Sequence, residues 1–187
     1  VVLMPEPMRN RETLERYDID GLELDFMREP YLFSVGKEAE GAPILSAWIR
    51  EVRRETEKAS ARRGHPIRLG VRIPSRPETA SQMGLDAVAW AKEGLIDLLV
   101  VTPRWATLEF DMPLDEWRKL LGTSKTTLAG GLEFLYRPFP GGNASPVTPE
   151  LATGAAVSVL SRGADVVYLF NYFQSTWTPP IYQNTLK

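Results

Sequence analysis

The chain contains no cysteine and only one histidine among its 187 residues. The absence of cysteine excludes disulfides, thiolate zinc sites and a cysteine nucleophile, and it fits a reducing compartment such as the cytoplasm. A serine–histidine–aspartate triad is limited to His65, which lies between Gly64 and Pro66. This turn precedes a predicted strand, whereas the chemistry of parallel α/β folds lies at the carboxyl ends of strands. We therefore expect His65 to be structural.

Long apolar runs and a strong charge imbalance are also missing. No stretch of about 18 apolar residues occurs, so we expect no membrane-spanning helix. The formal net charge is −2 and the isoelectric point is near 5.6, which predicts no general attraction to nucleic acid or to an anionic membrane. No G-x-G-x-x-G or P-loop motif occurs, which argues against a nucleotide-binding doubly wound fold. The length is sufficient for one domain with a substantial core.

What is present is an alternation of short apolar runs with amphipathic segments. This order predicts an α/β fold with a parallel sheet. We expect five strands, at Asp20–Met27, Ile67–Pro74, Ile96–Thr102, Thr127–Phe134 and Ala164–Tyr172. We expect helices at Glu12–Tyr17, Glu38–Arg63, Leu85–Lys92, Pro113–Leu121 and Thr148–Arg162. The glycine- and proline-rich segment Arg137–Val147 is predicted to be a long mobile connection.

The first predicted strand carries two acidic residues on one face. Leu22 and Leu24 alternate with Glu23 and Asp25, and side chains in a strand alternate between faces. Strands of a parallel sheet are normally apolar on both faces, and an unpaired buried charge is very costly. The two carboxylates therefore predict a polar cavity, a cation or a ligand. The carboxyl end of a barrel strand is also where a sugar-cleaving enzyme keeps its acids.

Other polar residues follow the remaining strands at the same end. In three strands a glycine stands two residues before a charged residue, which leaves room beneath a large side chain in a tight barrel. These pairs are Gly21 and Glu23, Gly70 and Arg72, and Gly131 and Glu133. Further polar or aromatic residues at the strand exits are Arg28, Arg76, Arg104, Trp105, Asn171, Tyr172, Gln174 and Trp177. The residues expected to bind substrate are Arg28, Arg72, Arg76, Arg104, Trp105, Asn171 and Tyr172. Their arginines either favour an anionic sugar or an acidic substituent, or only neutralise the carboxylates.

Structural roles remain open for the same residues. A structural role for Glu23, in which it neutralises the charge of Arg72, is as consistent with the sequence as a catalytic one. Asp25 alternatively caps a loop, and Glu133 alternatively pairs with an arginine. Trp105 packs either in the core or against a sugar. The tryptophans on predicted helices are expected in the core: Trp48, Trp90 and Trp117.

Segment 17–28, YDIDGLELDFMR, resembles a segment of uncharacterised bacterial glycoside-hydrolase-like (β/α)8 proteins. Segments 70–77, GVRIPSRP, and 100–105, VVTPRW, are similar to the same group, and the resemblance covers nearly the whole chain. It implies that the five strands are strands four to eight of a TIM barrel. Residues 1–187 are then one partial barrel domain of a longer chain, whose preceding strands are absent here.

The resemblance also implies hydrolysis of a carbohydrate by paired carboxylates. In many sugar-cleaving barrels these come from strands four and seven, here Asp25 or Glu23 together with Glu133. Asp25 is favoured over Glu23 because it lies nearer the strand end. A carboxylate separation of about 5 to 5.5 Å predicts retention and about 6.5 to 9.5 Å predicts inversion. One carboxyl group must be protonated, and the sequence does not assign which.

Two other functions remain open. The first is a non-catalytic carbohydrate-binding barrel in which the acids and Arg72 form a structural network. The second is a metal-dependent lyase or isomerase with Glu23, Asp25 and Glu133 as oxygen ligands. For the favoured hydrolase we expect neither a metal nor another cofactor.

Overall fold

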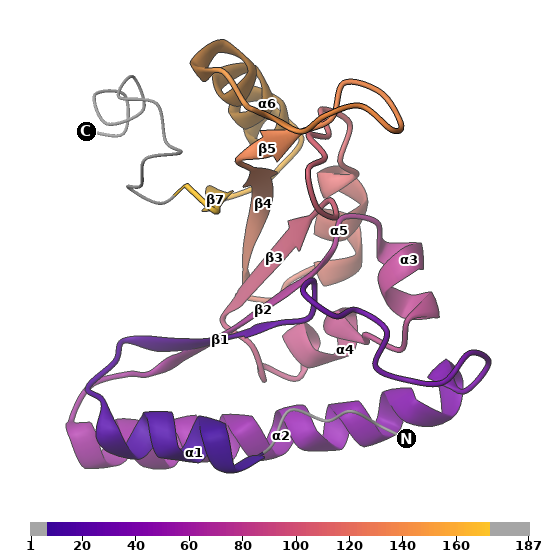
Figure 1. The fold of residues 1–187 in the computed structure, drawn as a ribbon. Helices are drawn as coiled ribbons and strands as arrows, with labels where there is room; N and C mark the ends of the chain where they lie inside the picture. Colours follow the sequence, from indigo (N-terminus) through magenta and orange to yellow (C-terminus); the bar gives the residue numbers. More distant parts are fainter. Residues whose placement is uncertain (1–6, 173–187) are drawn as a thin grey trace.

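The computed structural model describes residues 7–172 and contains one five-stranded parallel sheet (Figure 1). The strand order is β1-β2-β3-β4-β7, and each strand lies within its predicted range. The strands are β1 (Gly21–Asp25), β2 (Arg68–Pro74), β3 (Leu98–Thr102), β4 (Thr127–Glu133) and β7 (Val166–Phe170). The predicted α/β fold with five parallel strands is confirmed.

Helices cover the sheet, and their ends carry the residues that stop or start a helix. They are α1 (Pro7–Arg16), α2 (Glu38–Arg63), α3 (Pro77–Gln82), α4 (Ala87–Lys92), α5 (Leu114–Leu121) and α6 (Pro149–Ser161). Helix α2 ends at Gly64, whose φ of 80° is a left-handed conformation that glycine adopts without strain. Helix α6 begins after Thr148, whose Oγ1 accepts a hydrogen bond from the Leu151 N–H at 3.3 Å. Helix α3 was not predicted.

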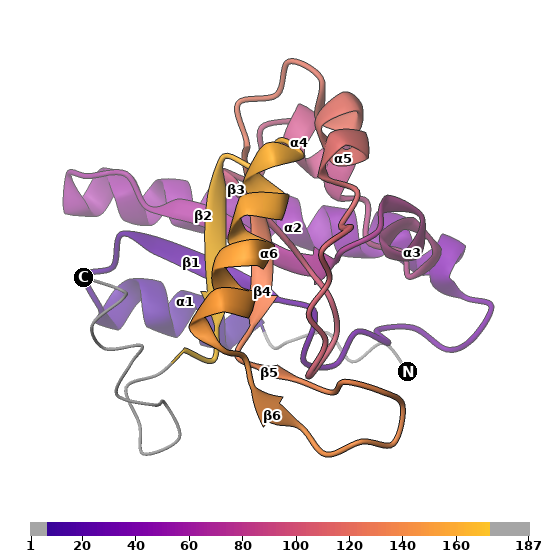
Figure 2. The same cartoon turned by 90° about the horizontal axis from the view of Figure 1, so that it is seen from above.

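The apolar core lies between the outer face of the sheet and the helices. In Figure 1, α1 and α2 run below β1 and β2, and Figure 2 shows α6 passing over β4 and β7. From β2, the side chains of Leu69, Val71 and Ile73 point into this core and are completely buried. The helical tryptophans are buried as predicted: Trp48, Trp90 and Trp117. Among residues 7–172, no helix combines the length and apolar character that crossing a membrane requires.

The sheet is strongly curved, so that side chains of its two edge strands make contact across the inner face. The hydroxyl of Tyr168 on β7 donates a hydrogen bond to Glu23 Oε1 on β1, at 3.0 Å. Since β1 and β7 are the outermost strands of the sheet, this contact requires a curvature like that of a barrel wall. The five strands therefore form a partial barrel with helices outside.

The long connection after β4 contains a small antiparallel hairpin, which the sequence did not predict. Strand β5 (Leu135–Tyr136) pairs with β6 (Ser145–Pro146). The Val147 N–H also donates to the Phe134 carbonyl at 2.8 Å. The segment predicted as a mobile connection is thus anchored at both ends by backbone hydrogen bonds (Figure 2).

Candidate active site

The inner face of the sheet is organised around the guanidinium of Arg72. Arg72 lies on β2 and is only 2% exposed. Its Nη1 lies 2.9 Å from each carboxylate oxygen of Asp25, which is its register partner on β1. Its Nη2 lies 3.6 Å from Glu133 Oε1 on β4. One buried cation therefore brings together the two acids that were predicted as a catalytic pair.

Two further features describe the surroundings of Arg72. Its guanidinium carbon lies 3.5 Å from the ring centroid of Phe170 on β7, a close cation–π contact. Its buried Nε has no hydrogen-bond partner within the part of the chain that the structure describes. A buried donor left in this way is costly unless water or a ligand accepts from it.

Asp25 is held in one orientation by three hydrogen bonds. Besides the two from Arg72, its Oδ1 accepts from the Met27 N–H at 2.8 Å. Asp25 therefore caps the loop, which was the alternative prediction, and also pairs with Arg72. The side chain of Asp25 is 32% exposed, so one edge of the carboxylate faces the open inner surface of the sheet.

Glu133 combines deep burial with weak neutralisation. The residue is 3% exposed, and burial raises the pKa of its carboxyl group. Arg72 and a hydrogen bond from the Ala106 backbone act in the opposite direction on this pKa. The 3.6 Å separation from Arg72 exceeds hydrogen-bond range, so its attraction does not offset the loss of hydration. The environment of Glu133 therefore favours its protonated form more than water does.

Glu23 has a different partner from the one predicted from sequence. It forms no ion pair with Arg72 among the described residues and accepts instead from Tyr168. Loss of hydration raises the pKa of Glu23, the Tyr168 hydrogen bond lowers it, and the charge of Asp25 raises it. Burial, followed by the negative charge of Glu23, raises the pKa of Tyr168 to about 12, so that Tyr168 remains a donor. The pairing of Glu23 with Arg72 was wrong because Asp25 is the register partner of that arginine.

A cavity of about 90 Å³ lies beside this network at the carboxyl ends of the strands. Two residues near it have left-handed backbone conformations, Ala106 with φ of 49° and Asn171 with φ of 61°. Asparagine tolerates this region, whereas alanine adopts it at a cost. The cavity is lined by Arg28, Arg72, Trp105, Glu133, Phe170 and Asn171. Neither Asp25 nor Glu23 is part of the cavity wall, and Asp25 is connected to it by its hydrogen bonds from Arg72.

The other predicted binding residues lie in different places. Arg76 and Arg104 line a second cavity, which is described below. Tyr172 packs edge-on against Phe134, with ring centroids 5.4 Å apart, and lines neither of these two cavities. Gln174 and Trp177 lie outside the described residues. His65 Nε2 donates a hydrogen bond to Asp18 Oδ1 at 2.8 Å, at the opposite end of the sheet.

The sequence analysis missed three contributors to the site. Tyr168 and Phe170 share the inward phase of the last strand, and that alternation is a signal that identifies both. No sequence pattern indicates that the backbone of Ala106 donates a hydrogen bond to the Glu133 carboxyl group. The glycine pattern was informative at Gly131, where an added Cβ would lie 2.7 Å from the Thr102 side chain. At Gly70 the corresponding contact is an ordinary 3.4 Å, so this glycine is not required for space.

Within residues 7–172, no three histidine, aspartate or glutamate side chains are grouped as a metal site. Arg72 lies between Asp25 and Glu133, and Glu23 is engaged by Tyr168.

No family model matches the chain, and no curated protein matches it in sequence. Solved structures to which the chain is similar include one from Bacteroides thetaiotaomicron that is described as a "putative alpha-L-fucosidase". The two chains share 14% sequence identity with a TM-score of 0.48. The match covers 74% of this chain and 49% of the other, so this chain spans about half the length of that protein.

Proposed function

We propose that the chain carries the paired carboxylates of a glycoside hydrolase. The observation that supports this proposal is the meeting of Asp25 and Glu133, from the ends of two strands, at one guanidinium beside a cavity. Two carboxyl groups in different environments are what acid-assisted cleavage of a glycosidic bond requires.

The two environments support different roles for the two carboxyl groups. Glu133 is buried and its pKa is raised, so it is the general acid that protonates the leaving oxygen. Asp25 is oriented by Arg72 and Met27 and is partly open, so its carboxylate acts on the opposite side of the sugar ring. Arg72 positions both groups. Trp105, which is 60% exposed at the cavity, offers an aromatic face for a sugar ring.

The test is hydrolysis of a panel of 4-nitrophenyl glycosides by the wild type and by Asp25→Asn and Glu133→Gln. We expect each variant to lose about 10²- to 10⁴-fold in kcat/KM, the usual contribution of a positioned acid or base. Glu116→Gln, an exposed acid on α5, is the matched control and should retain full activity. Equal activity in all four proteins would rule out this pair as catalytic.

The pH profile tests the assignment of the acid. Because burial raises the pKa of Glu133, the wild-type activity should persist above the ordinary glutamate value of 4.5 and fall as Glu133 loses its proton. Residual activity in Glu133→Gln should lack this alkaline decline. An unchanged decline in that variant would assign the titration to another group.

A non-catalytic carbohydrate-binding protein is the second candidate. The observation that favours it is that Arg72 directly pairs with Asp25 and approaches Glu133, as in a structural ion network. In that case no glycoside in the panel is cleaved, while sugar binding by wild type and Glu133→Gln is equal.

A further inference from the structure

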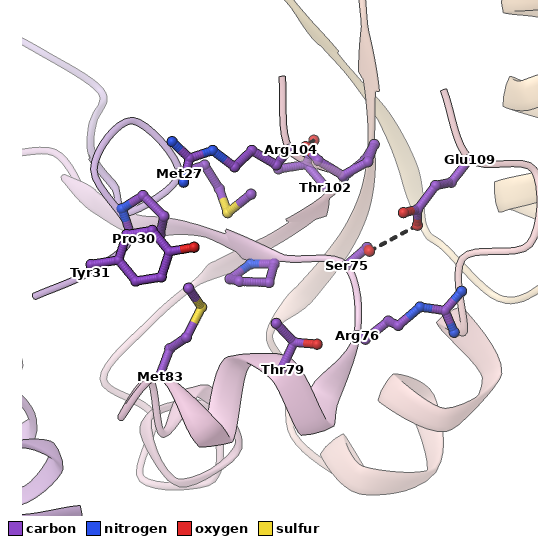
Figure 3. Close-up of a pocket in the computed structure, with 12 residues that line it drawn as sticks. Met27, Pro30, Tyr31, Ser75, Arg76, Thr79, Met83, Thr102, Arg104 and Glu109 are labelled. Atoms are coloured by element: carbon purple, nitrogen blue, oxygen red, sulfur yellow. Dashed lines mark hydrogen bonds between the residues drawn. The ribbon is translucent and has the colours of Figure 1, made fainter. Parts of the chain in front are cut away.

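A second and larger cavity lies next to the candidate active site and has no role in the proposed chemistry. Its volume is about 260 Å³, and it lies between the loops that follow β1 and β3, beside α3 (Figure 3). Met27 lines both cavities, so the two are neighbours along the carboxyl edge of the sheet. A drug-sized ligand usually occupies about 300–1,000 Å³, so this smaller space suits a single sugar unit.

The two loops are joined by a reciprocal pair of cation–π contacts. Arg28, after β1, lies 5.8 Å from the ring centroid of Trp105, after β3. In return Arg104, after β3, lies 5.8 Å from the ring centroid of Tyr31, after β1. Arg28 and Trp105 line the smaller cavity, whereas Arg104 and Tyr31 line the larger one. The loops therefore present one cation and one exposed ring to each cavity.

The polar lining of the larger cavity leaves a positive charge available. Within residues 7–172, no carboxylate lies within ion-pair distance of Arg104. Glu109 accepts a 2.8 Å hydrogen bond from the Ser75 hydroxyl, at the end of the cavity away from Tyr31 (Figure 3). Arg76 has a carboxylate partner in Asp111 at 3.5 Å, and both side chains are more than half exposed. The unpaired guanidinium is thus that of Arg104.

We propose that the larger cavity is a subsite for a sugar unit that bears an anionic group, with Arg104 as the residue that recognises the anion. This inference rests on the proposed function and names its substrate class as an acidic glycan. A guanidinium matches a carboxylate or a sulfate through two parallel hydrogen bonds. The sugar ring lies against the exposed face of Tyr31, which already holds Arg104 at the cavity. The linked unit extends from this subsite past Met27, which lines both cavities, toward Glu133 and Asp25.

The experiment measures binding rather than hydrolysis, in the wild-type protein, because the monosaccharide probes contain no glycosidic bond that a hydrolase could cleave. The probes are glucuronic acid and galactose 6-sulfate, with glucose and galactose as neutral controls, titrated by calorimetry or ligand-observed NMR. We expect at least one anionic probe to bind more tightly than its neutral counterpart, and the tighter one identifies the source of the anion. Raised salt should weaken this preference.

Arg104→Gln should weaken binding of the preferred anion by about 10- to 100-fold, as expected for loss of a charge-assisted hydrogen-bond pair. Arg104→Lys should restore part of this loss, because it keeps the charge without the planar fork. Arg54→Gln, an exposed arginine on α2, is the control and should leave binding unchanged. Equal binding of anionic and neutral probes, no binding of any probe, or no effect of Arg104→Gln would overturn the subsite.

These outcomes are separable from those of the proposed function. Anion-selective binding that depends on Arg104 supports the subsite even where no glycoside is cleaved. Carboxylate-dependent hydrolysis of neutral glycosides without anion selectivity supports the hydrolase and overturns the subsite.

Discussion

The buried arginine is the residue whose removal should affect folding most. Arg72→Met leaves Glu133 buried without its cation and removes two hydrogen bonds from Asp25. Breaking a buried pair in this way typically lowers the free energy of unfolding by about 3–5 kcal/mol. Urea denaturation measures this value. Arg62→Met, at an exposed position on α2, is the control and should change it by less than about 0.5 kcal/mol.

The double variant Arg72→Met/Glu133→Gln separates the lost attraction from the cost of an uncompensated charge. We expect it to recover part of the stability at a pH at which Glu133 is ionised, because a neutral amide is less costly to bury than a carboxylate. If the single and double variants are equally stable, the burial of Glu133 is not what makes Arg72 necessary.

The single histidine gives a pH-dependent signal at the other end of the sheet. The hydrogen bond with Asp18 raises the pKa of His65 above 6.5, and the same bond lowers the pKa of Asp18 below 3.8. The His65 contribution to stability is full below pH 6.5 and is lost as pH rises through the raised pKa. The Asp18 contribution is present above pH 3.8 and is lost as pH falls through the lowered pKa.

An NMR titration of the histidine ring tests this pairing, and the signal is unambiguous because the chain has one histidine. Asp18→Asn should return the pKa of His65 toward 6.5. An identical titration in both proteins would show that the contact does not persist in solution.

At the scale of elements, the packing of α6 on β4 depends on a glycine. A Cβ added at Gly130 would lie 2.7 Å from the Cβ of Val159, whereas one at Gly154 on α6 would lie 3.4 Å from the exposed Phe110 ring. We expect Gly130→Ala to lower the free energy of unfolding by about 1–3 kcal/mol, because it overpacks the core. Gly154→Ala should raise it by up to about 1 kcal/mol through helix propensity. Two equal shifts in chemical denaturation would contradict the tight contact.

Strands and long helices were predictable because their signals are local. The alternation of apolar and acidic residues around Glu23 located β1, and the apolar run located β3. The capping residues located the end of α2 and the start of α6. Helix α3 was missed because its six residues, PETASQ, have little apolar periodicity. The hairpin β5–β6 was missed because each of its strands has only two residues.

The same distinction applies to the candidate site. The alternation of side chains along the strands was sufficient to predict that Asp25, Arg72 and Glu133 lie on the same face of the sheet. The partner of Glu23 depends instead on the curvature of the whole sheet, which brings Tyr168 from 145 residues away. The exchanged contacts of Arg28 and Arg104 depend on loop conformations for which the sequence carries no periodic signal.

For the whole molecule, the free edges of the sheet are the main feature that remains to be explained. Among residues 7–172, β1 pairs only with β2, and β7 pairs only with β4. Free edges leave backbone donors and acceptors unpaired, and barrels remove them by closure. We propose that further strands of the same protein, preceding this segment, complete the wall between β7 and β1.

This proposal predicts that residues 1–187 are less stable alone than within a longer polypeptide. Three more βα units correspond to about 100 residues, on the scale of a complete barrel. The longer polypeptide should unfold cooperatively at a higher temperature and remain monomeric, because its edge strands are paired. Residues 1–187 alone should self-associate and show little activity, since the inner face then lacks the wall between β7 and β1 that would exclude water from bound substrate. Calorimetry and light scattering measure both properties, and a monomeric, cooperative and fully active short segment would contradict the missing wall.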